Sequence, residues 1–182
     1  MAESATDVVN LIKAQHEQVK GLLTRVATGS GSELESAFCD LRRMIVVHET
    51  AEEEVVYPAL RASGAEGQRV VEERTKEEQH GTEVLSKLED AGVSSGQFST
   101  MFEQFRTAVL NHAEAEEATV LPLLQRTQSE EQLRKMASAF EVAEKAAPTH
   151  AHPHTGTSAV SNMVTGPAVA MIDRVRDALR KS

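Results

Sequence analysis

The sequence predicts an all-α protein: an antiparallel, up-down-up-down four-helix bundle with additional C-terminal helices. Three observations predict this fold class. Aromatic residues make up only 3% of the 182 residues and Trp is absent, while Ala, Leu, Val and Glu are abundant, which favours helices over sheets. Apolar residues recur at helical spacing along most of the N-terminal two thirds of the chain. Clusters of Gly and Ser at 28–32, 62–67 and 91–96 separate these segments and indicate turns.

The four segments between these turns each carry an apolar stripe. In the first, second and fourth segments the stripes are, in order, Val8, Ile12, Val19 and Leu23; Phe38, Leu41, Ile45 and Val55; and Phe98, Phe102, Phe105, Val109 and Val120. The third segment, at about 65–90, is far more polar, and we expect Val70, Val84 and Leu88 to form its buried stripe. Helices of this length span roughly 35–45 Å, and the short turns require neighbouring helices to run antiparallel.

A fifth helix is predicted at about 129–146, where a Ser-Glu-Glu cap signal begins it and Pro148 follows its end. A stretch with His150, His152 and His154 comes next, and a short amphipathic helix is expected at about 167–180. The histidine tract could bind a metal loosely, donate protons near the bundle, or form an exposed turn. We therefore divide the chain into a bundle, 1–127, and a C-terminal helix and tail, 128–182, packing on it.

Composition and charge exclude several classes of protein. The formal net charge is −9, which argues against nucleic acid as a partner because phosphate binding requires clustered Lys and Arg. Cys39 is the only cysteine and cannot form an internal disulfide; we expect it to be buried. The N-terminus has no signal-peptide pattern, and no run of 18 apolar residues suggests a membrane span. We expect a soluble, cytoplasmic protein with no membrane partner.

Four of the seven histidines stand at a constant interval of 32 residues, at positions 16, 48, 80 and 112. The predicted turns fall near the midpoints of these intervals. In an antiparallel bundle, residues at equal distances before and after a turn come level with one another. His16, His48, His80 and His112 are therefore predicted to lie at one height.

Two of these histidines lie in a repeated pattern. The segments HETAEEEVVYP at 48–58 and HAEAEEATVLP at 112–122 share His-x3-Glu-Glu-x4-Pro in register, which indicates duplication of a helical hairpin. Residues at i and i+4 share a helix face, so each histidine and the glutamate after it, Glu52 or Glu116, can bind metal on the same side. We expect Pro58 and Pro122 to kink or end these helices.

These polar side chains fall on apolar stripes, so they are expected inside the bundle. Burying imidazoles and carboxylates without partners costs several kcal/mol each, and metal ions can satisfy them. Mixed imidazole and carboxylate ligation suits iron, manganese or zinc, and six ligands in two matched sets favour a dinuclear centre. No catalytic residue beyond the metal centre is predicted. Glu53, Glu54 and Glu117 are interpreted as a solvated face.

The order of these residues resembles the hemerythrin and hemerythrin-like family, of the bacterial type with an HHE cation-binding domain. A lone His on the first helix, His-x3-Glu on the second, His on the third and His-x3-Glu on the fourth carry the resemblance. It implies two iron ions with an oxo or hydroxo bridge. His16 and His48 would bind one iron, His80 and His112 the other, and Glu52 and Glu116 would bridge them. The implied partners are O2, hydrogen peroxide or nitric oxide, with an unidentified electron donor.

The sequence departs from the oxygen carriers of this family at one position. They have His-x3-His on the third helix, whereas Lys76 and Val84 flank His80 here. Candidates for the missing ligand are Tyr57, Glu49 and Glu83, or solvent takes its place. Tyr57 lies five residues beyond Glu52, about 7.5 Å along the helix axis, so its side chain could reach back to an iron.

A phenolate ligand would stabilise ferric iron and disfavour reversible O2 carriage, which needs a diferrous state. We therefore favour an enzyme, a di-iron peroxidase or catalase-like oxidoreductase that decomposes hydrogen peroxide or uses it to oxidise nitric oxide. Reversible O2 binding or storage is the first alternative, and an iron or oxygen sensor is the second. The same ligands serve all three functions in different surroundings, so the sequence leaves them open.

Overall fold

The computed structural model describes residues 7–147, which contain helices and no strand. The helical segments, in chain order, are α1 Val8–Thr28, α2 Gly31–Ala51, η1 Glu52–Val56, α3 Tyr57–Ala62, α4 Ala65–Ala91, α5 Phe98–Ala115, η2 Glu116–Val120, α6 Leu121–Thr127 and α7 Glu130–Ala146. The segments η1 and η2 are π-helical turns that join α2 to α3 and α5 to α6 without a break. The all-α fold class is confirmed.

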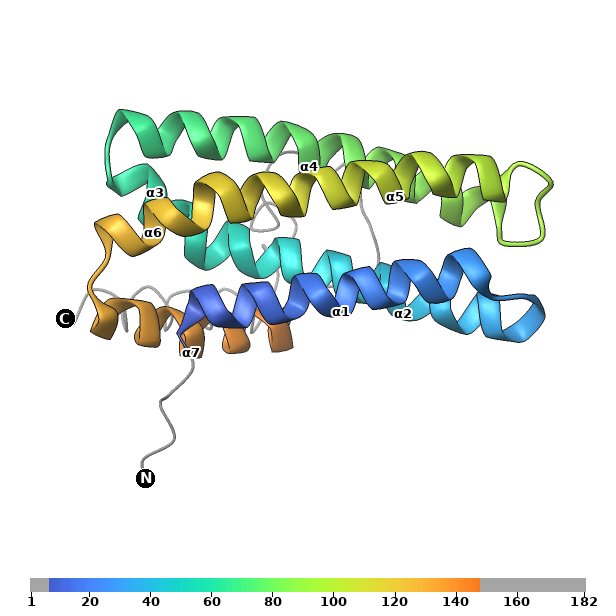
Figure 1. Ribbon diagram of the computed structural model, residues 1–182, viewed down its shortest axis with the longest axis horizontal. Coiled ribbons are helices and arrows are strands. Elements are labelled where there is room, and N and C mark those ends of the chain that lie inside the picture. The colour runs from blue at the N-terminus through green and yellow to red at the C-terminus, as the bar shows by residue number, and fades with distance from the viewer. Residues whose placement is uncertain (1–6, 148–182) are drawn as a thin grey trace, which may run out of the picture.

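Four long rods run antiparallel and form the bundle (Figure 1). The rod α1 packs against α2, and α4 packs against α5. The fifth helix, α7, lies beside α1, α2 and η1 at one end of the bundle. The expected helix at 167–180 and the histidine tract at 150–154 lie outside the described residues.

Local capping signals set the helix ends. Asp7 caps α1, where its side chain accepts from the Asn10 N–H at 2.9 Å. Ser129 and Gln132 form a reciprocal capping box at the start of α7, as the Ser-Glu-Glu signal predicts. All three predicted turns contain a glycine in the left-handed region; Gly64, for example, has φ of 113°. A side chain there would be strained, so glycine is the favoured residue.

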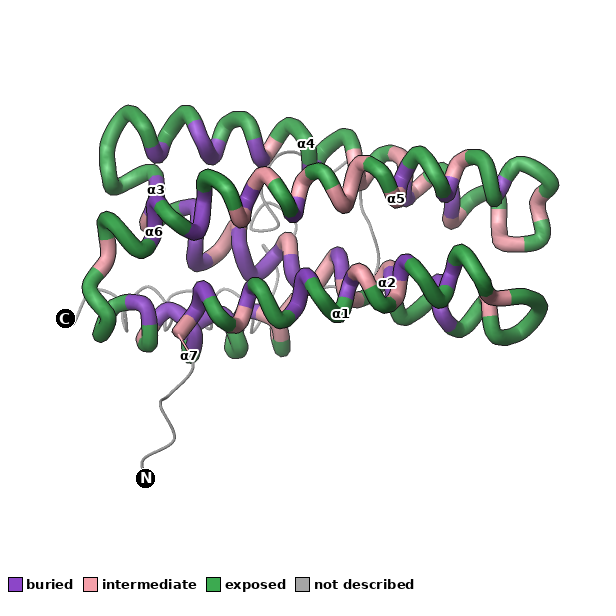
Figure 2. Tube along the Cα trace, viewed as in Figure 1, coloured by how far each residue is buried: buried purple, intermediate pink, exposed green. Residues whose placement is uncertain are grey.

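Two apolar clusters fill the bundle, one at each end. The first brings together the start of α1, α3, α6 and α7, with Ile12, Leu60, Leu124 and Phe140 fully buried. The second joins the end of α1 to α2, α4 and α5 around Leu41. Figure 2 shows the buried positions facing inward along every rod. The polar residues predicted to bind metal lie between these clusters.

The repeated sequence pattern is repeated in the backbone. Both wide turns begin at the glutamate that follows the motif histidine, Glu52 in one half and Glu116 in the other. Pro58 and Pro122 follow them inside the continuing helices. Of the two expected effects, ending the helices is therefore wrong, and a local distortion, the widened turn, precedes each proline. A proline ring conflicts with the carbonyl four residues earlier, and a widened turn before it relieves that conflict.

The buried stripe of α4 differs from the predicted one. Val70 and Leu88 are buried as expected, but Val84 is only half-buried and Leu85 is fully buried. Val71 is also fully buried, seven residues from Glu78 on the other side from Leu85. Because Val71 and Leu85 set the phase of the stripe, the position midway between them faces the interior.

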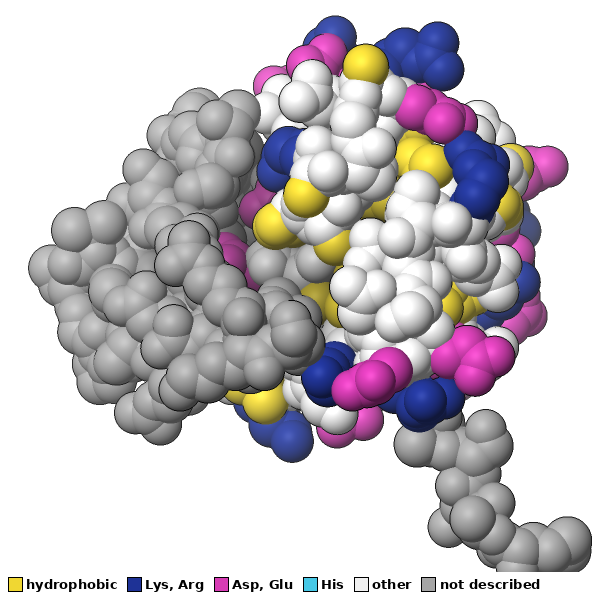
Figure 3. Space-filling view, turned by 90° about the vertical axis from the view of Figure 1, so that its left-hand side faces the viewer, with side chains coloured by type: hydrophobic (Ala, Val, Ile, Leu, Met, Phe, Trp, Pro, Cys, Tyr) yellow, Lys and Arg dark blue, Asp and Glu magenta, His cyan; other side chains and the backbone are white. Residues whose placement is uncertain are grey.

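Cys39 is exposed, so its predicted burial is wrong. It directly follows the buried residues Ala37 and Phe38. Figure 3, which views one end of the bundle, shows acidic and basic side chains interspersed on the described residues. Within residues 7–147, no helix combines the length and the apolar character needed to cross a membrane.

Candidate metal centre

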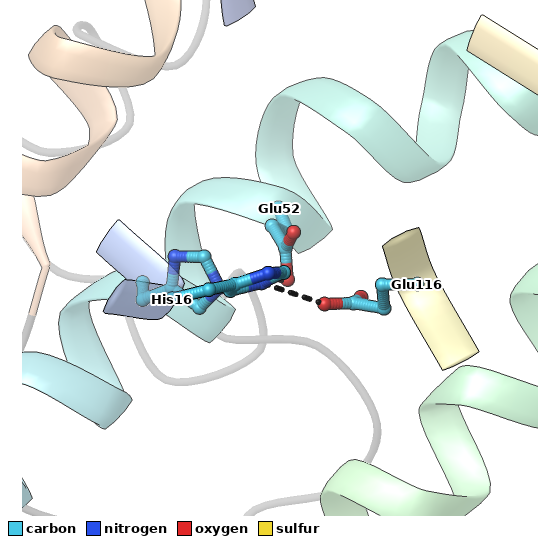
Figure 4. A group of neighbouring side chains, drawn as sticks. His16, Glu52 and Glu116 are labelled. Carbon is cyan, nitrogen blue, oxygen red and sulfur yellow. Dashed lines mark ion pairs between the residues drawn. The ribbon is translucent and has the colours of Figure 1, made fainter. Parts of the chain in front are cut away.

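Histidine and glutamate side chains from three rods meet between the two apolar clusters. His16 comes from α1, His48 and Glu52 from the α2–η1 junction, and His112 and Glu116 from the α5–η2 junction. Both glutamates are fully buried, and His16 is 2% exposed. Figure 4 shows His16 pointing towards Glu116, with Glu52 beside them. Five of the six histidine and glutamate ligands predicted therefore lie in one cluster, in which only His112 is partly exposed.

The donor atoms form two groups that share two carboxylates. One group consists of His16, His48, Glu52 and Glu116, and the other of Glu52, Glu78, His112 and Glu116. Within each group, one donor atom per residue lies within 4.8 Å of the others. Since Glu52 and Glu116 belong to both groups, they are positioned to bridge two cations.

Glu116 contacts histidines of both groups. Its Oε2 lies 3.3 Å from Nε2 of His16, and its Oε1 lies 3.4 Å from Nε2 of His112. The two oxygens of one carboxylate thus face histidines of different groups. Glu52 Oε2 lies 3.5 Å from Nε2 of His48.

Each histidine is held at Nδ1 by an oxygen outside the cluster. His16 Nδ1 contacts Glu117 Oε1 at 3.0 Å, His48 Nδ1 contacts Gln15 Oε1 at 2.7 Å, and His112 Nδ1 contacts Glu77 Oε2 at 3.0 Å. An oxygen acceptor at Nδ1 keeps the proton there. Each neutral ring is then left with a lone pair on Nε2, the arrangement that metal-binding histidines adopt.

Buried polar atoms that lack a hydrogen bond show whether the cluster is suited to a cation. Seven buried atoms of the cluster have no hydrogen-bond partner among the described residues: Nε2 of His16, His48 and His112, both carboxylate oxygens of Glu52, Oε2 of Glu78 and Oε2 of Glu116. Buried polar atoms without hydrogen bonds are costly, and here they converge from several helices, joined only by the histidine–glutamate contacts of 3.3–3.5 Å. The donor set is imidazole and carboxylate, which suits a transition-metal cation.

The electrostatics of the cluster also favour a bound cation. Burial raises the pKa of Glu52 well above its ordinary value, and the neighbouring Glu116 raises it further. Burial also opposes ionisation of Glu116, but the surrounding histidines outweigh it and hold its pKa at about 2. Burial lowers the pKa of His48 to about 3, so this ring is neutral near neutral pH. The carboxylates can ionise together only if cations neutralise them.

The structure places His80 apart from the cluster. It is exposed on α4 and belongs to neither donor group, although it lines the same cavity as the other three histidines. Glu78, which is 5% exposed, occupies the interior position of α4. Glu78 was not predicted, because the regular spacing of the four histidines indicates that the side of α4 carrying His80 faces the interior. The seven-residue spacing of Val71, Glu78 and Leu85 is the signal that could have found it.

Tyr57 reaches the centre from the start of α3. It is fully buried, its hydroxyl donates to Glu78 Oε1, and the same hydroxyl lies 3.2 Å from Glu116 Oε1. Of the other candidates for the missing ligand, Glu49 is half-buried on the cavity wall and Glu83 is exposed on α4. Tyr57 is therefore in contact with donor residues, and its role as a ligand stays a prediction.

Glu117 is not part of a solvated face. Its side chain is 34% exposed, contacts His16 and lies 3.8 Å from Nζ of Lys20. Acidic runs usually face solvent, which is why the sequence predicts a surface position for it. Here the residue next to the bridging glutamate reaches across to α1 and orients a histidine.

A cavity of about 370 Å³ reaches the cluster. Its polar wall includes His16, His48, Glu78 and His112, and the charged residues Lys76 and Glu77 also line it. Val19, Ile45 and Val109 form part of its apolar wall. Small molecules can approach the buried donor atoms through this space.

The fold and the site define a helical bundle whose histidine and glutamate side chains could hold metal cations between the helices. The chain belongs to the hemerythrin HHE cation-binding domain family, which matches residues 7–124. The predicted family resemblance is confirmed. The match ends before α7.

Two relatives resemble the chain over about three quarters of its length. An uncharacterised hemerythrin-like protein of Schizosaccharomyces pombe is 33% identical over 135 residues, which are 74% of this chain and 66% of that protein. A protein of a Nostoc species named DNA nickase is 25% identical, over 75% of this chain and 39% of its own length. The matched region thus spans less than two thirds of either relative.

A solved structure has the same fold. It is the crystal structure of a hemerythrin HHE cation-binding domain-containing protein from Mycobacterium kansasii, with a TM-score of 0.68 and 20% sequence identity. The superposition covers 93% of this chain and 99% of the other.

Proposed function

We propose that the centre binds two iron ions and acts on hydrogen peroxide, either decomposing it or using it to oxidise nitric oxide. The observation that carries the proposal is the oxygen-rich half of the centre. Glu78, Glu52 and Glu116 surround His112, and the Tyr57 hydroxyl contacts two of these carboxylates. Hard oxygen donors favour ferric iron over ferrous iron, which disfavours reversible O2 binding.

When bound, the iron ions would supply the redox chemistry by which one peroxide molecule is reduced and another is oxidised. Two peroxide molecules then yield two waters and one O2. With nitric oxide as co-substrate, one peroxide and two nitric oxide molecules yield two molecules of nitrous acid. Both reactions balance without an external reductant.

The residues of the chain have separate roles in this proposal. Glu117, Gln15 and Glu77 hold the three histidines through Nδ1. The Tyr57 hydroxyl keeps a proton inside the centre, where burial and the charge of Glu78 raise its pKa well above the usual range. The cavity of about 370 Å³ admits small molecules, and its apolar wall limits the water around them.

We also propose that the partners are small molecules rather than nucleic acid or membranes, and that the protein works in the cytoplasm. The net charge of −9 supports the first part, because a DNA-binding surface requires an excess of Lys and Arg.

The proposal is tested by loading the protein with ferrous iron without oxygen, counting iron per chain, and measuring O2 release from hydrogen peroxide with an electrode. Nitric oxide consumption is followed with and without peroxide. We expect two irons per chain, and activity that Glu52→Gln abolishes and Glu114→Gln retains. Glu114 is a matched control because it is an exposed glutamate on α5.

A protein that holds two irons and leaves both peroxide and nitric oxide untouched would overturn the proposed reaction. If its diferrous form then bound O2 reversibly, with an optical band that disappears under vacuum, the protein would be an oxygen-binding protein instead.

A further inference from the structure

The three histidines of the centre differ in the partner that holds Nδ1. His16 and His112 face the carboxylates of Glu117 and Glu77, and an ionised carboxylate can only accept a hydrogen bond. These two partners therefore keep a proton on Nδ1 by themselves. His48 faces the amide of Gln15, which can present either an acceptor oxygen or a donor NH2 group. Gln15 alone does not determine where the His48 proton lies.

The other end of the Gln15 amide removes this ambiguity. Gln15 Nε2 lies 2.8 Å from Oε1 of Glu144, on α7. Because a carboxylate cannot donate, the NH2 group must face Glu144 and Gln15 Oε1 must face His48. That oxygen lies 2.7 Å from His48 Nδ1, which must donate to it. The lone pair of His48 is then on Nε2, 3.5 Å from Glu52 Oε2.

The helix that carries Glu144 is packed firmly against His48. Phe140 is fully buried, four residues before Glu144 on the same face of α7. Its ring meets the His48 ring edge-on, with centroids 6.1 Å apart. Gln15 is 6% exposed, so water has little access to the amide.

We propose that Glu144 and Gln15 are positioning residues that select the metal-binding tautomer of His48. The helix α7 lies beyond the residues that match the family, yet it determines the proton position on one ligand of the centre. A reversed amide would present NH2 to Nδ1, move the proton to Nε2 and block the lone pair that a cation requires.

The tautomer can be measured without metal. Long-range nitrogen–proton correlation spectra of ¹⁵N-histidine-labelled, metal-free protein distinguish a ring protonated at Nδ1 from one protonated at Nε2. The spectra are recorded at mildly alkaline pH so that Glu144 is ionised. We expect the wild-type His48 ring to carry its proton on Nδ1.

The decisive variant is Glu144→Gln, which leaves an amide that can either donate to Gln15 or accept from it. We expect His48 to become a mixture of tautomers or to shift to the Nε2-protonated form. Glu141→Gln is the matched control, since it removes the same charge from an exposed position on α7. An unchanged His48 tautomer in Glu144→Gln would overturn the proposal.

An exchange of the two side chains provides a rescue test. In the double variant Gln15→Glu/Glu144→Gln, the new carboxylate at 15 accepts from His48 Nδ1–H, and the new amide at 144 donates to that carboxylate. The pattern of donors and acceptors is restored, so we expect the Nδ1-protonated form to return. If the single variant does not fold, this double variant still decides the matter, because a ring protonated at Nε2 in it contradicts the proposal.

The second readout is metal affinity, and only this part rests on the proposed metal centre. Loss of an outer hydrogen-bond partner typically weakens metal binding about 10–100-fold. We expect Zn²⁺ titrations to show a loss in that range for Glu144→Gln and none for Glu141→Gln. Because the tautomer is read in the metal-free protein, a failure of the peroxide hypothesis leaves this result intact. Equal Zn²⁺ affinity in all variants would remove the proposed effect on binding.

Discussion

Glu78 and His80 lie two positions apart on α4, and only Glu78 points into the centre. Its Oε1 lies 3.8 Å from Nε2 of His112, and its Oε2 has no hydrogen-bond partner among the described residues. A cation placed between Glu52 and His112 would have Glu78 within reach. The exposed ring of His80 would have to turn inward to bind it.

This placement leads to a prediction that separates the two residues. Glu78→Gln should lower the number of Zn²⁺ or Fe²⁺ ions bound from two per chain towards one, because it removes a charged donor from one half of the centre. His80→Gln should leave the number unchanged. Isothermal titration with each metal checks both variants. If His80→Gln lowered the number of bound ions and Glu78→Gln did not, His80 would be the ligand, as the regular spacing of the four histidines predicts.

The buried carboxyl groups predict a pH dependence of stability in the metal-free protein. Burial raises the pKa of Glu52 and Glu78, and it raises the pKa of Glu49 from an ordinary value of 4.5 to about 8. Between the unfolded and folded pKa values the folded state binds more protons, so the free energy of unfolding falls as pH rises. We expect melting temperatures to decline between pH 4.5 and 8, most steeply above pH 6.5, because the lowered pKa of His48 has the opposite effect below that pH.

Glu116 behaves in the opposite way. Its pKa of about 2 lies below the ordinary value, so its contribution to stability is present above pH 4.5 and is lost only towards pH 2. Saturating cation should flatten the decline by neutralising the ionised groups. Thermal melts with and without Zn²⁺ across this range are the measurement, and a metal-free protein that becomes more stable towards pH 8 would contradict the account.

At the residue scale, most residues of the histidine and glutamate cluster could be predicted from the sequence. The i, i+4 pairs, His48 with Glu52 and His112 with Glu116, lie together because that spacing keeps side chains on one face even where the helix widens. Glu78 was not predictable from histidine spacing, since the phase of α4 depends on packing against α3 and α5. The outer partners Gln15 and Glu117 could not be predicted either, because their contacts join different helices.

At the scale of elements, the three turns were predictable from their clusters of Gly and Ser. The turn between α3 and α4 also requires a glycine for close packing. A Cβ atom added to Gly67 would lie 1.9 Å from the carbonyl oxygen of Leu60, so α3 and α4 approach closely here. Gly67→Ala must push the two helices apart.

We expect Gly67→Ala to lower the free energy of unfolding by about 1–3 kcal/mol, the usual cost of forced overpacking. Gly21→Ala is the control, because no heavy atom lies within 4 Å of the position of its Cβ. That variant should raise stability by up to about 1 kcal/mol, since alanine loses less entropy in a helix. Chemical denaturation of both proteins compares them, and equal stabilities would show that the turn can relax.

The π-helical turns are the elements that the sequence did not predict. The spacing His-x3-Glu fits an α-helix and a widened helix alike, so periodicity cannot distinguish them. The prolines at 58 and 122 predict a kink or an end of each helix, but not a widened turn. In the structure the helices continue, because the chain adjusts the turn before each proline.

At the scale of the whole molecule, α7 is part of the folded unit. Phe140 is fully buried in the apolar cluster at the α7 end of the bundle and touches His48. Truncating such a ring removes transfer free energy and leaves a cavity.

Phe140→Ala should therefore destabilise the whole bundle by about 3–5 kcal/mol. Val142→Ala, which changes a side chain that is 37% exposed on the same helix, should change stability by less than about 0.5 kcal/mol. Helical circular dichroism during denaturation measures both. If Phe140→Ala melted only a small fraction of the helical signal, α7 would be an independent appendage.

Each wide turn also changes how the chain beyond it must be aligned with other sequences. An α-helix advances about 100° per residue, so one extra residue in a turn rotates everything after it by that angle. Deleting one residue from Glu52–Val56 would restore an ordinary helix and swing Tyr57 away from Glu78 and Glu116. A relative that is one residue shorter in this segment would keep both motif residues, His48 and Glu52, and lose the phenol. The number of residues in this segment, more than overall sequence identity, therefore decides whether a tyrosine after it can face the centre.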